Sequence, residues 1–194
     1  MVADLFGAGA LAHDPGGSKR FRLQPGVRGS AQFGGPRQEY RHWLRRDWGG
    51  DGAPYALWIG MNPSTAEAHV DDPTIRREME FTRRLGFTSY IKVNVMDYRA
   101  THPQVLLLLL AGSAEWLSSP ENLQTIAAKA AGAEMVVAAW GSLPKALRGY
   151  ASDAAGAVIG SGRLLTCLGT TADGSPRHPL YIRGDAAFIP WARR

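Results

Sequence analysis

The sequence has little cysteine: Cys167 is the only thiol among its 194 residues. A single cysteine excludes a disulfide within the chain, a zinc site built from cysteine pairs and a four-cysteine iron–sulfur cluster. The five histidines lie far apart, and no two of them have the His-x-x-x-His spacing of a helical metal site. We therefore predict no metal, no other cofactor and a reducing, cytoplasmic compartment.

Long hydrophobic runs are also absent. The longest purely apolar stretch, residues 105–111, is far shorter than the ~20 residues that a membrane-spanning helix needs. The apolar N-terminus lacks a leading basic region and runs into His13, Asp14 and Pro15, unlike a secretory signal. We therefore expect no membrane association.

The phosphate-binding and nucleophile motifs of several enzyme classes are missing as well. The sequence contains neither a Gly-x-x-x-x-Gly-Lys-Ser/Thr loop nor a Gly-x-Gly-x-x-Gly fingerprint, which excludes the nucleotide sites that those loops build. It also lacks the Gly-x-Ser-x-Gly elbow of serine hydrolases. Any site must therefore be found from the positions of other polar residues.

The composition is that of a globular protein with a mild positive charge. Hydrophobic residues make up 45% and charged residues 20%, and the formal net charge is +5. This charge favours phosphate-bearing partners. Residues 1–37 are rich in Gly and Pro with scattered basic residues, so we predict a flexible extension or, alternatively, a basic arm that contacts nucleic acid. Residues 38–194 form one predicted α/β domain, and we expect a monomer.

Strand and helix patterns alternate along this domain. Apolar runs predict core strands at 55–60, 89–95, 134–140 and 164–168, and helical patterns follow at 72–86, 102–110, 121–132 and 144–150. The leucine run 106–110 predicts that the second of these helices is buried. This alternation predicts a three-layer αβα fold around a central, mainly parallel four-stranded sheet. Residues 39–48 alternate bulky and charged side chains, which predicts an edge strand in an N-terminal β-hairpin with 55–60.

Polar residues lie at the end of each predicted core strand. Asn62 follows the first strand, Asn94 ends the second, Ser142 follows the third and His178 follows the fourth. Ligands of such sheets bind outside the carboxyl ends of the strands, so we expect these side chains around one cleft. Pro63 holds Asn62 in extended geometry, where its amide could orient a water or a ligand; a turn Asn bonded to its own backbone is the alternative.

The pair Asp71-Asp72 stands just before Pro73-Thr74. Two adjacent carboxylates could chelate Mg²⁺. An acidic residue directly before Pro is also a typical helix start, because the carboxylate caps the first turn and Pro fits the first helical position. We favour the helix cap.

Several segments together, in this order, have the pattern of a known family: 40–47, 60–66, 71–74, 93–94, 99–101, 140–141 and 177–181. They resemble the domain-of-unknown-function family 1643 over roughly residues 38–191. That resemblance implies no activity.

A more distant resemblance implies one. Gly60-Met61-Asn62-Pro63 is similar to the first motif of the uracil-DNA glycosylase superfamily, and Val93-Asn94-Val95 to the strand that bears its base-reading Asn. Residues 136–142 are similar to its Trp-Gly-Ser strand end, and His178-Pro179 to the His-Pro of its second catalytic motif. The order of the motifs is also the same.

The second resemblance implies an N-glycosidase that releases a damaged or modified nucleobase from DNA or a nucleotide. Asn62 would position the attacking water and His178 would stabilise the departing base, while Asn94 would read the base edge. The other implied substrate-binding residues are Gly60, Met61, Pro63, Ser64, Ser142 and Pro179. We also expect Arg99 and Arg177 to contact phosphate.

The sequence departs from that superfamily at three points, one of which is that no aromatic residue directly follows Asn62-Pro63. Asn62 is an amide and cannot act as a general base, and Leu180 replaces the Ser that often follows His-Pro. Uracil specificity therefore does not follow. Two alternatives stay open: a module that binds a base or nucleotide without catalysis, and a different reaction on a modified nucleobase. His178 could equally be a rim histidine bonded to backbone.

Overall fold

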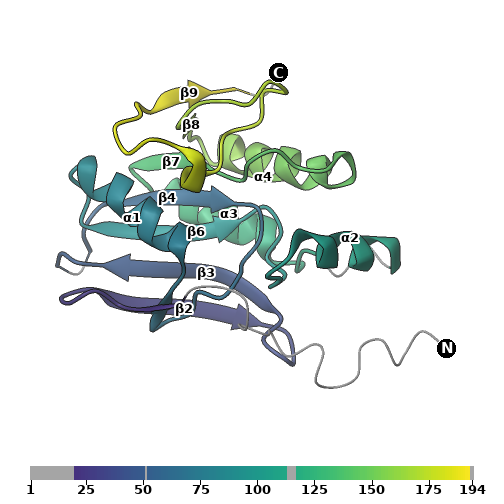
Figure 1. Ribbon diagram of the computed structural model, residues 1–194, viewed down its shortest axis with the longest axis horizontal. Helices are drawn as coiled ribbons and strands as arrows, with labels where there is room; N and C mark the ends of the chain where they lie inside the picture. The colour runs from purple at the N-terminus through teal and green to yellow at the C-terminus, as the bar shows by residue number, and fades with distance from the viewer. Residues whose placement is uncertain (1–19, 51, 113–116, 193–194) are drawn as a thin grey trace.

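The computed structural model describes residues 20–50, 52–112 and 117–192 of the chain (Figure 1). Its strands are β1 (Phe21–Arg22), β2 (Arg28–Gly34), β3 (Tyr40–Asp47), β4 (Tyr55–Gly60), β5 (Val70–Asp71), β6 (Ser89–Asn94), β7 (Met135–Ala138), β8 (Leu165–Cys167) and β9 (Ile189–Trp191). Its helices are α1 (Pro73–Arg84), α2 (Pro103–Gly112), α3 (Asn122–Ala131) and α4 (Arg148–Gly160), with 3-10 turns η3 (Lys145–Leu147) and η4 (Pro179–Tyr181).

The main sheet is mixed and has seven strands in the order β2-β3-β6-β4-β7-β8-β9. The pairings β6–β4, β4–β7 and β7–β8 are parallel, whereas β2–β3, β3–β6 and β8–β9 are antiparallel. The α/β class is as predicted, but the predicted mainly parallel four-stranded sheet is not confirmed, because the sheet has seven strands and half of its pairings are antiparallel. The additional strands were missed because β2 is rich in glycine and β9 is short and contains Pro190.

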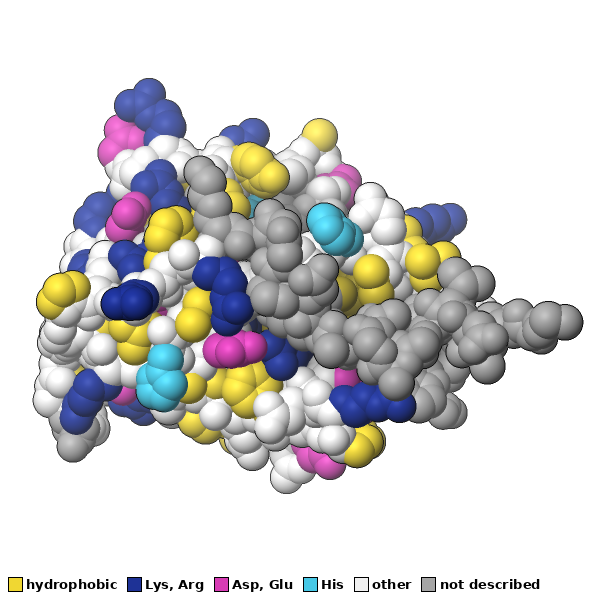
Figure 2. Space-filling view, turned by 60° about the horizontal axis from the view of Figure 1, so that its bottom comes forward, with side chains coloured by type: hydrophobic (Ala, Val, Ile, Leu, Met, Phe, Trp, Pro, Cys, Tyr) yellow, Lys and Arg dark blue, Asp and Glu magenta, His cyan; other side chains and the backbone are white. Residues whose placement is uncertain are grey.

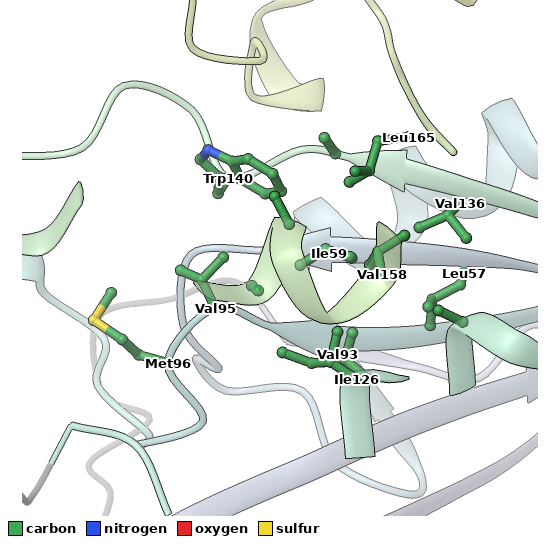
Figure 3. Close-up of a cluster of buried hydrophobic side chains, with 14 of the residues drawn as sticks. Leu57, Ile59, Val93, Val95, Met96, Ile126, Val136, Trp140, Val158 and Leu165 are labelled. Atoms are coloured by element: carbon green, nitrogen blue, oxygen red, sulfur yellow. The ribbon is translucent and has the colours of Figure 1, made fainter. Parts of the chain in front are cut away.

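Helices cover both faces of this sheet (Figure 1). Residues Leu57 and Ile59 of β4 face α3 and α4, in a core that includes Ile126 and Val158 (Figure 3). The alternate residue Trp58 faces α1 in a second core cluster. This alternation follows from the strand period of two and gives each face its own packing partner.

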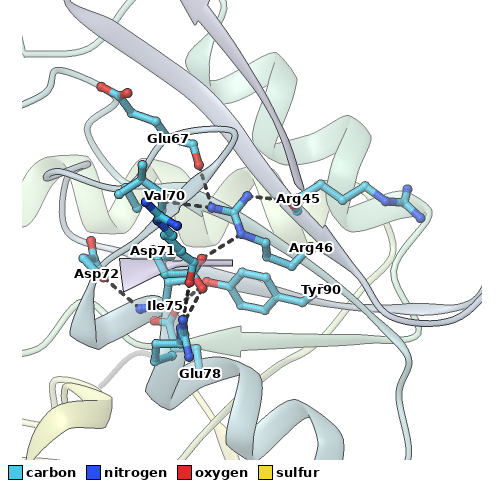
Figure 4. A network of polar contacts seen from close by, with 12 residues as sticks. Arg45, Arg46, Glu67, Val70, Asp71, Asp72, Ile75, Glu78 and Tyr90 are labelled. Carbon is cyan, nitrogen blue, oxygen red and sulfur yellow. Dashed lines mark hydrogen bonds and ion pairs between the residues drawn. The ribbon is translucent and has the colours of Figure 1, made fainter. Parts of the chain in front are cut away.

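Helix α1 begins as the sequence predicts. The carboxylate of Asp72 accepts a hydrogen bond from the backbone N–H of Ile75 at 2.9 Å, and Pro73 occupies the first turn. Asp71 forms ion pairs with Arg46 and Arg76 at 2.8 and 2.7 Å (Figure 4). Both carboxylates therefore have protein partners that account for them, and the cap interpretation is confirmed.

The predicted hairpin between β3 and β4 is wrong. Strand β6 lies between them, antiparallel to β3 and parallel to β4. β3 is also not an edge strand, because β2 pairs along its other side. The charged residues of β3 suggested a wet face, but Arg41 and Arg46 are buried, and Arg46 pairs with the equally buried Asp71.

Part of the predicted flexible extension is folded. Strand β2 pairs with β3 over its whole length, and β1 pairs with β5. The glycines of β2 reflect close packing: a Cβ on Gly29 would lie 2.0 Å from the carbonyl oxygen of Ala68. Residues 1–19 of the predicted extension lie outside the described residues, whereas its basic residues Arg20, Arg22 and Arg28 are described.

Two further helix predictions need correction. In α2, Leu106 is buried but Leu108 is 66% exposed, so the leucine run is not a fully buried helix. The short helix expected at 144–150 continues to Gly160 as α4. In the described part of the chain, no helix combines the length and the apolar character needed to cross a bilayer.

Candidate functional site

A cleft of about 820 Å³ lies at the carboxyl ends of β4, β6 and β7. Of the residues predicted from sequence, the following line it: Gly60, Met61, Asn62, Ser64, Asn94, Ser142, Arg177 and His178. The two prolines Pro63 and Pro179 are buried beside it. The expectation that the polar strand ends meet around one cleft is therefore met in the geometry.

The side chain of Asn62 is held in place by two hydrogen bonds that its amide nitrogen donates. Its Nδ2 donates to the carbonyl oxygens of Pro63 at 3.0 Å and Ala100 at 2.7 Å. The contact to Pro63 is of the local kind expected for a turn Asn, whereas the contact to Ala100 joins two separate loops. With both N–H groups engaged, Oδ1 is the atom that this amide can offer to a water or a ligand.

Asn94 is fully buried next to the cleft that it lines, and neither its Oδ1 nor its Nδ2 has a hydrogen-bond partner. A buried polar group without a partner costs about 1–3 kcal/mol, so this amide is poised for a partner that binds there. Gly60 on the neighbouring strand makes the space: a Cβ there would lie 2.9 Å from Oδ1 of Asn94 and 2.6 Å from Nζ of Lys92.

His178 enters the cleft from the loop after β8. Its Nδ1 accepts a hydrogen bond from the backbone N–H of Leu180 at 3.4 Å, which leaves Nε2 to carry the proton of the neutral ring. Burial, and then the nearby charge of Lys92, lower the pKa of His178 to about 4. The ring is thus a neutral donor at pH 7. Gly141, at φ 76°, lets the loop approach closely.

The other polar residues predicted for the site lie either at the rim of the cleft or outside it. Ser142 is exposed and its hydroxyl donates to Asp173 at 3.0 Å. Arg177 is exposed at the rim. Arg99 does not reach the cleft: its guanidinium pairs with Glu67 at 2.7 Å and stacks over Phe33. The cause is local, because the backbone N–H of Arg99 donates to Glu39 and turns this segment back toward β3.

The sequence reasoning missed the buried charges of the cleft. Lys92 lines it, and its ammonium donates to Glu78, which also accepts a hydrogen bond from the Tyr90 hydroxyl. Glu78 and Tyr90 lie together in the polar network between β3 and α1 (Figure 4). Burial raises the pKa of Glu78 and of Tyr90. A lysine inside the apolar run SYIKVN, two residues before Asn94, was the available signal.

Arg41 is the second missed cation. It lines the cleft, is 2% exposed, and its Nη1 donates to the carbonyl oxygen of Ala66 at 2.8 Å. Its Nε has no hydrogen-bond partner. Burial lowers the pKa of Arg41 to about 10, so the guanidinium is still charged at pH 7.

Metal-binding groups do not gather in the described residues: no three His, Cys, Asp or Glu side chains there are arranged to hold an ion. Asp72 lines the cleft, but its carboxylate caps α1. The chemistry available in the cleft is therefore that of two amides, a neutral imidazole and two buried cations.

Comparison with known proteins gives one family. The family model described as "Protein of unknown function (DUF1643)" matches residues 41–180. The chain belongs to this family. The DUF1643 region begins at Arg41 in β3 and includes Asn62, Lys92, Asn94 and His178, so most of the cleft lies within it. No curated protein and no solved structure matches the chain.

Proposed function

We propose that the cleft binds a damaged or modified nucleobase and hydrolyses its N-glycosidic bond, with the residue roles implied by the resemblance to the uracil-DNA glycosylase superfamily. The observation that carries this proposal is Asn94, whose buried amide lines the cleft with an unpartnered donor group, Nδ2, and an unpartnered acceptor, Oδ1. Adjacent donors and acceptors are what the edge of a nucleobase offers.

The size of the cleft supports the same class of ligand. A volume of about 820 Å³ exceeds what a base alone requires and is within the range of small-molecule sites, roughly 300–1,000 Å³. The lining is mostly polar and includes the aromatic residues Trp140 and Tyr181. A base with its sugar fits this description.

The proposed mechanism assigns separate tasks to Asn62 and His178. Oδ1 of Asn62 accepts a hydrogen bond from a water and directs its oxygen at the anomeric carbon. As the glycosidic bond breaks, charge builds on the departing base, and Nε2–H of neutral His178 donates to it. Since Asn62 cannot take the proton, the proton that the attacking water loses passes through solvent to the departing base, and most of the rate enhancement must come from leaving-group stabilisation.

A second candidate function is binding of the same nucleobase without hydrolysis. The amide at position 62 favours it, because its two N–H groups are already engaged and it cannot activate water as a base. The two candidates share Asn94 and differ only in what Asn62 and His178 contribute.

Base release distinguishes them. Purified protein is incubated with oligonucleotides and nucleotides carrying a panel of damaged and modified bases, and free base is quantified by liquid chromatography with mass spectrometry. We expect release from at least one substrate, with His178→Ala and Asn62→Ala lowering turnover while equilibrium binding changes little. Binding without any release would contradict hydrolysis and establish the binding module.

A further inference from the structure

The cleft extends across four neighbouring strand positions, and its two ends differ in charge. His178 lies at one end, beyond β7, whereas Arg41 lies on β3, two strands away from β4 in the sheet order. Neighbouring strands are ~4.8 Å apart, so the Arg41 end is separated from the Gly60 position by about 10 Å. Asn94 and Lys92 on β6 stand between them.

Arg41 reaches this face because β3 contains a bulge. The register pairs Gln32 with Trp43 and Phe33 with Arg41, which leaves His42 as the additional residue. A bulge of one residue reverses the side-chain alternation beyond it. Arg41 therefore lies on the α1 face, near Asp72, while His42 bonds Asp97 at 2.9 Å.

The two cations at this end, Arg41 and Lys92, have N–H donors that are not all engaged by protein groups. Arg41 makes no ion pair with any described residue, and its buried Nε is unpartnered. Lys92 has three N–H donors, and Glu78 takes one of them. The two carboxylates nearby are already engaged, Glu78 by Lys92 and Tyr90, and Asp72 by the first turn of α1.

We propose that this end of the cleft is an oxyanion subsite, in which Arg41 and Lys92 bind the terminal phosphate of a free nucleotide. A guanidinium fork matches the geometry of phosphate oxygens. Burial selects a terminal group: Arg41 is 2% exposed, and an internal phosphodiester would need two chain exits from an enclosed position. The nucleotide assignment rests on the proposed base site at Asn94, whereas the oxyanion subsite stands on Arg41 and Lys92.

The first test compares ligands with and without the phosphate. The full chain is titrated calorimetrically with the nucleosides of the five common bases and of the damaged and modified bases in the release panel, and with their 5′-monophosphates. For the base that binds most tightly, we expect the monophosphate to have a Kd at least about tenfold lower than the nucleoside. Equal Kd values would overturn the subsite. If the same base binds more tightly than the monophosphate when it is part of a single-stranded oligonucleotide, or when its nucleoside carries a 5′-carboxylate, recognition of a terminal phosphate is contradicted.

The second test places the effect on Arg41. In Arg41→Met we expect the Kd difference between nucleoside and monophosphate to disappear while the nucleoside Kd is unchanged. Arg183→Met is the matched control, since that arginine is 87% exposed and pairs with Asp185; the difference should persist. If Arg41→Met raises the Kd of the nucleoside and of the monophosphate equally, Arg41 only stabilises the loop at Ala66, and the proposal is overturned.

Two further measurements cover the cases in which Arg41→Met does not fold or no base is released. If Arg41→Met does not fold, Arg41→Lys retains the charge without the fork and should reduce the difference to less than about threefold; an undiminished difference would overturn the role of Arg41. Base release is measured on the same preparations. If the phosphate lowers Kd but no base is released, the oxyanion subsite is supported and hydrolysis is contradicted. If base is released but the phosphate has no effect on Kd, hydrolysis is supported and the oxyanion subsite is contradicted.

Discussion

The two faces of the central sheet are built from the same strands but differ in chemistry. On β6, Ile91 and Val93 face α3 and α4 and pack in an apolar core. The alternate residues Tyr90, Lys92 and Asn94 are equally buried but polar. An apolar face gains stability from area removed from water, whereas a buried polar face must satisfy each group individually. The cleft lies on the polar face, where Asn94 and Arg41 have buried polar atoms without a partner.

The largest effect is expected on the polar face, at Asp71. Asp71→Ala leaves the buried guanidinium of Arg46 without its ion-pair partner, which typically costs about 3–5 kcal/mol. Urea denaturation followed by circular dichroism measures the loss. A change below about 1 kcal/mol would show that the backbone carbonyls of Glu67 and Val70, which Arg46 also contacts, suffice for it.

A somewhat smaller effect is expected on the apolar face. Leu165→Ala, at a side chain 3% exposed in β8, should lower the free energy of unfolding by about 2–5 kcal/mol because it leaves a cavity. The neighbouring Leu164 is 83% exposed, so Leu164→Ala should change stability by less than ~0.5 kcal/mol. Similar losses in the two variants would contradict the assignment of the faces.

Asn94 should affect binding more than folding. Asn94→Ala relieves the cost of an amide that has no partner within the protein but leaves a small cavity, so the two effects should leave the unfolding transition nearly in place. The same change should weaken binding of the best nucleobase ligand by about 1–3 kcal/mol, because a base edge loses its reader. Calorimetric titration together with thermal unfolding checks both halves. A large loss of stability with unchanged binding would make Asn94 a structural residue.

A further effect depends on pH and concerns His178. Its pKa is lowered to about 4, below the ordinary value near 6.5, so the fold favours the neutral ring. This contribution to stability is complete above pH 6.5 and is lost as the pH falls toward 4. Stability should therefore decline over this range more in the unmodified protein than in His178→Gln. An NMR titration midpoint of His178 near 6.5 would contradict this environment.

The parts of the fold and of the site that could be predicted from the sequence are those that depend on local sequence patterns or on general properties of parallel sheets. Helix α1 was predictable because Asp72-Pro73 is a local signal with a local outcome. The meeting of Asn62, Asn94 and His178 followed from a general property of parallel strands. The place of β3 was not predictable, because its charged residues are buried by partners far along the chain, such as Asp71. The bulge at His42 is likewise fixed by pairing with β2.

Strand β9 has a consequence for how copies of this chain meet in solution. Its residues pair antiparallel to β8 and end the sheet on that side, with Pro190 opposite Thr166. Proline has no N–H, so at this position the outermost strand cannot offer a donor to another strand. The exposed border of the sheet is thus a poor template for strand addition, which limits aggregation along this edge at high protein concentration.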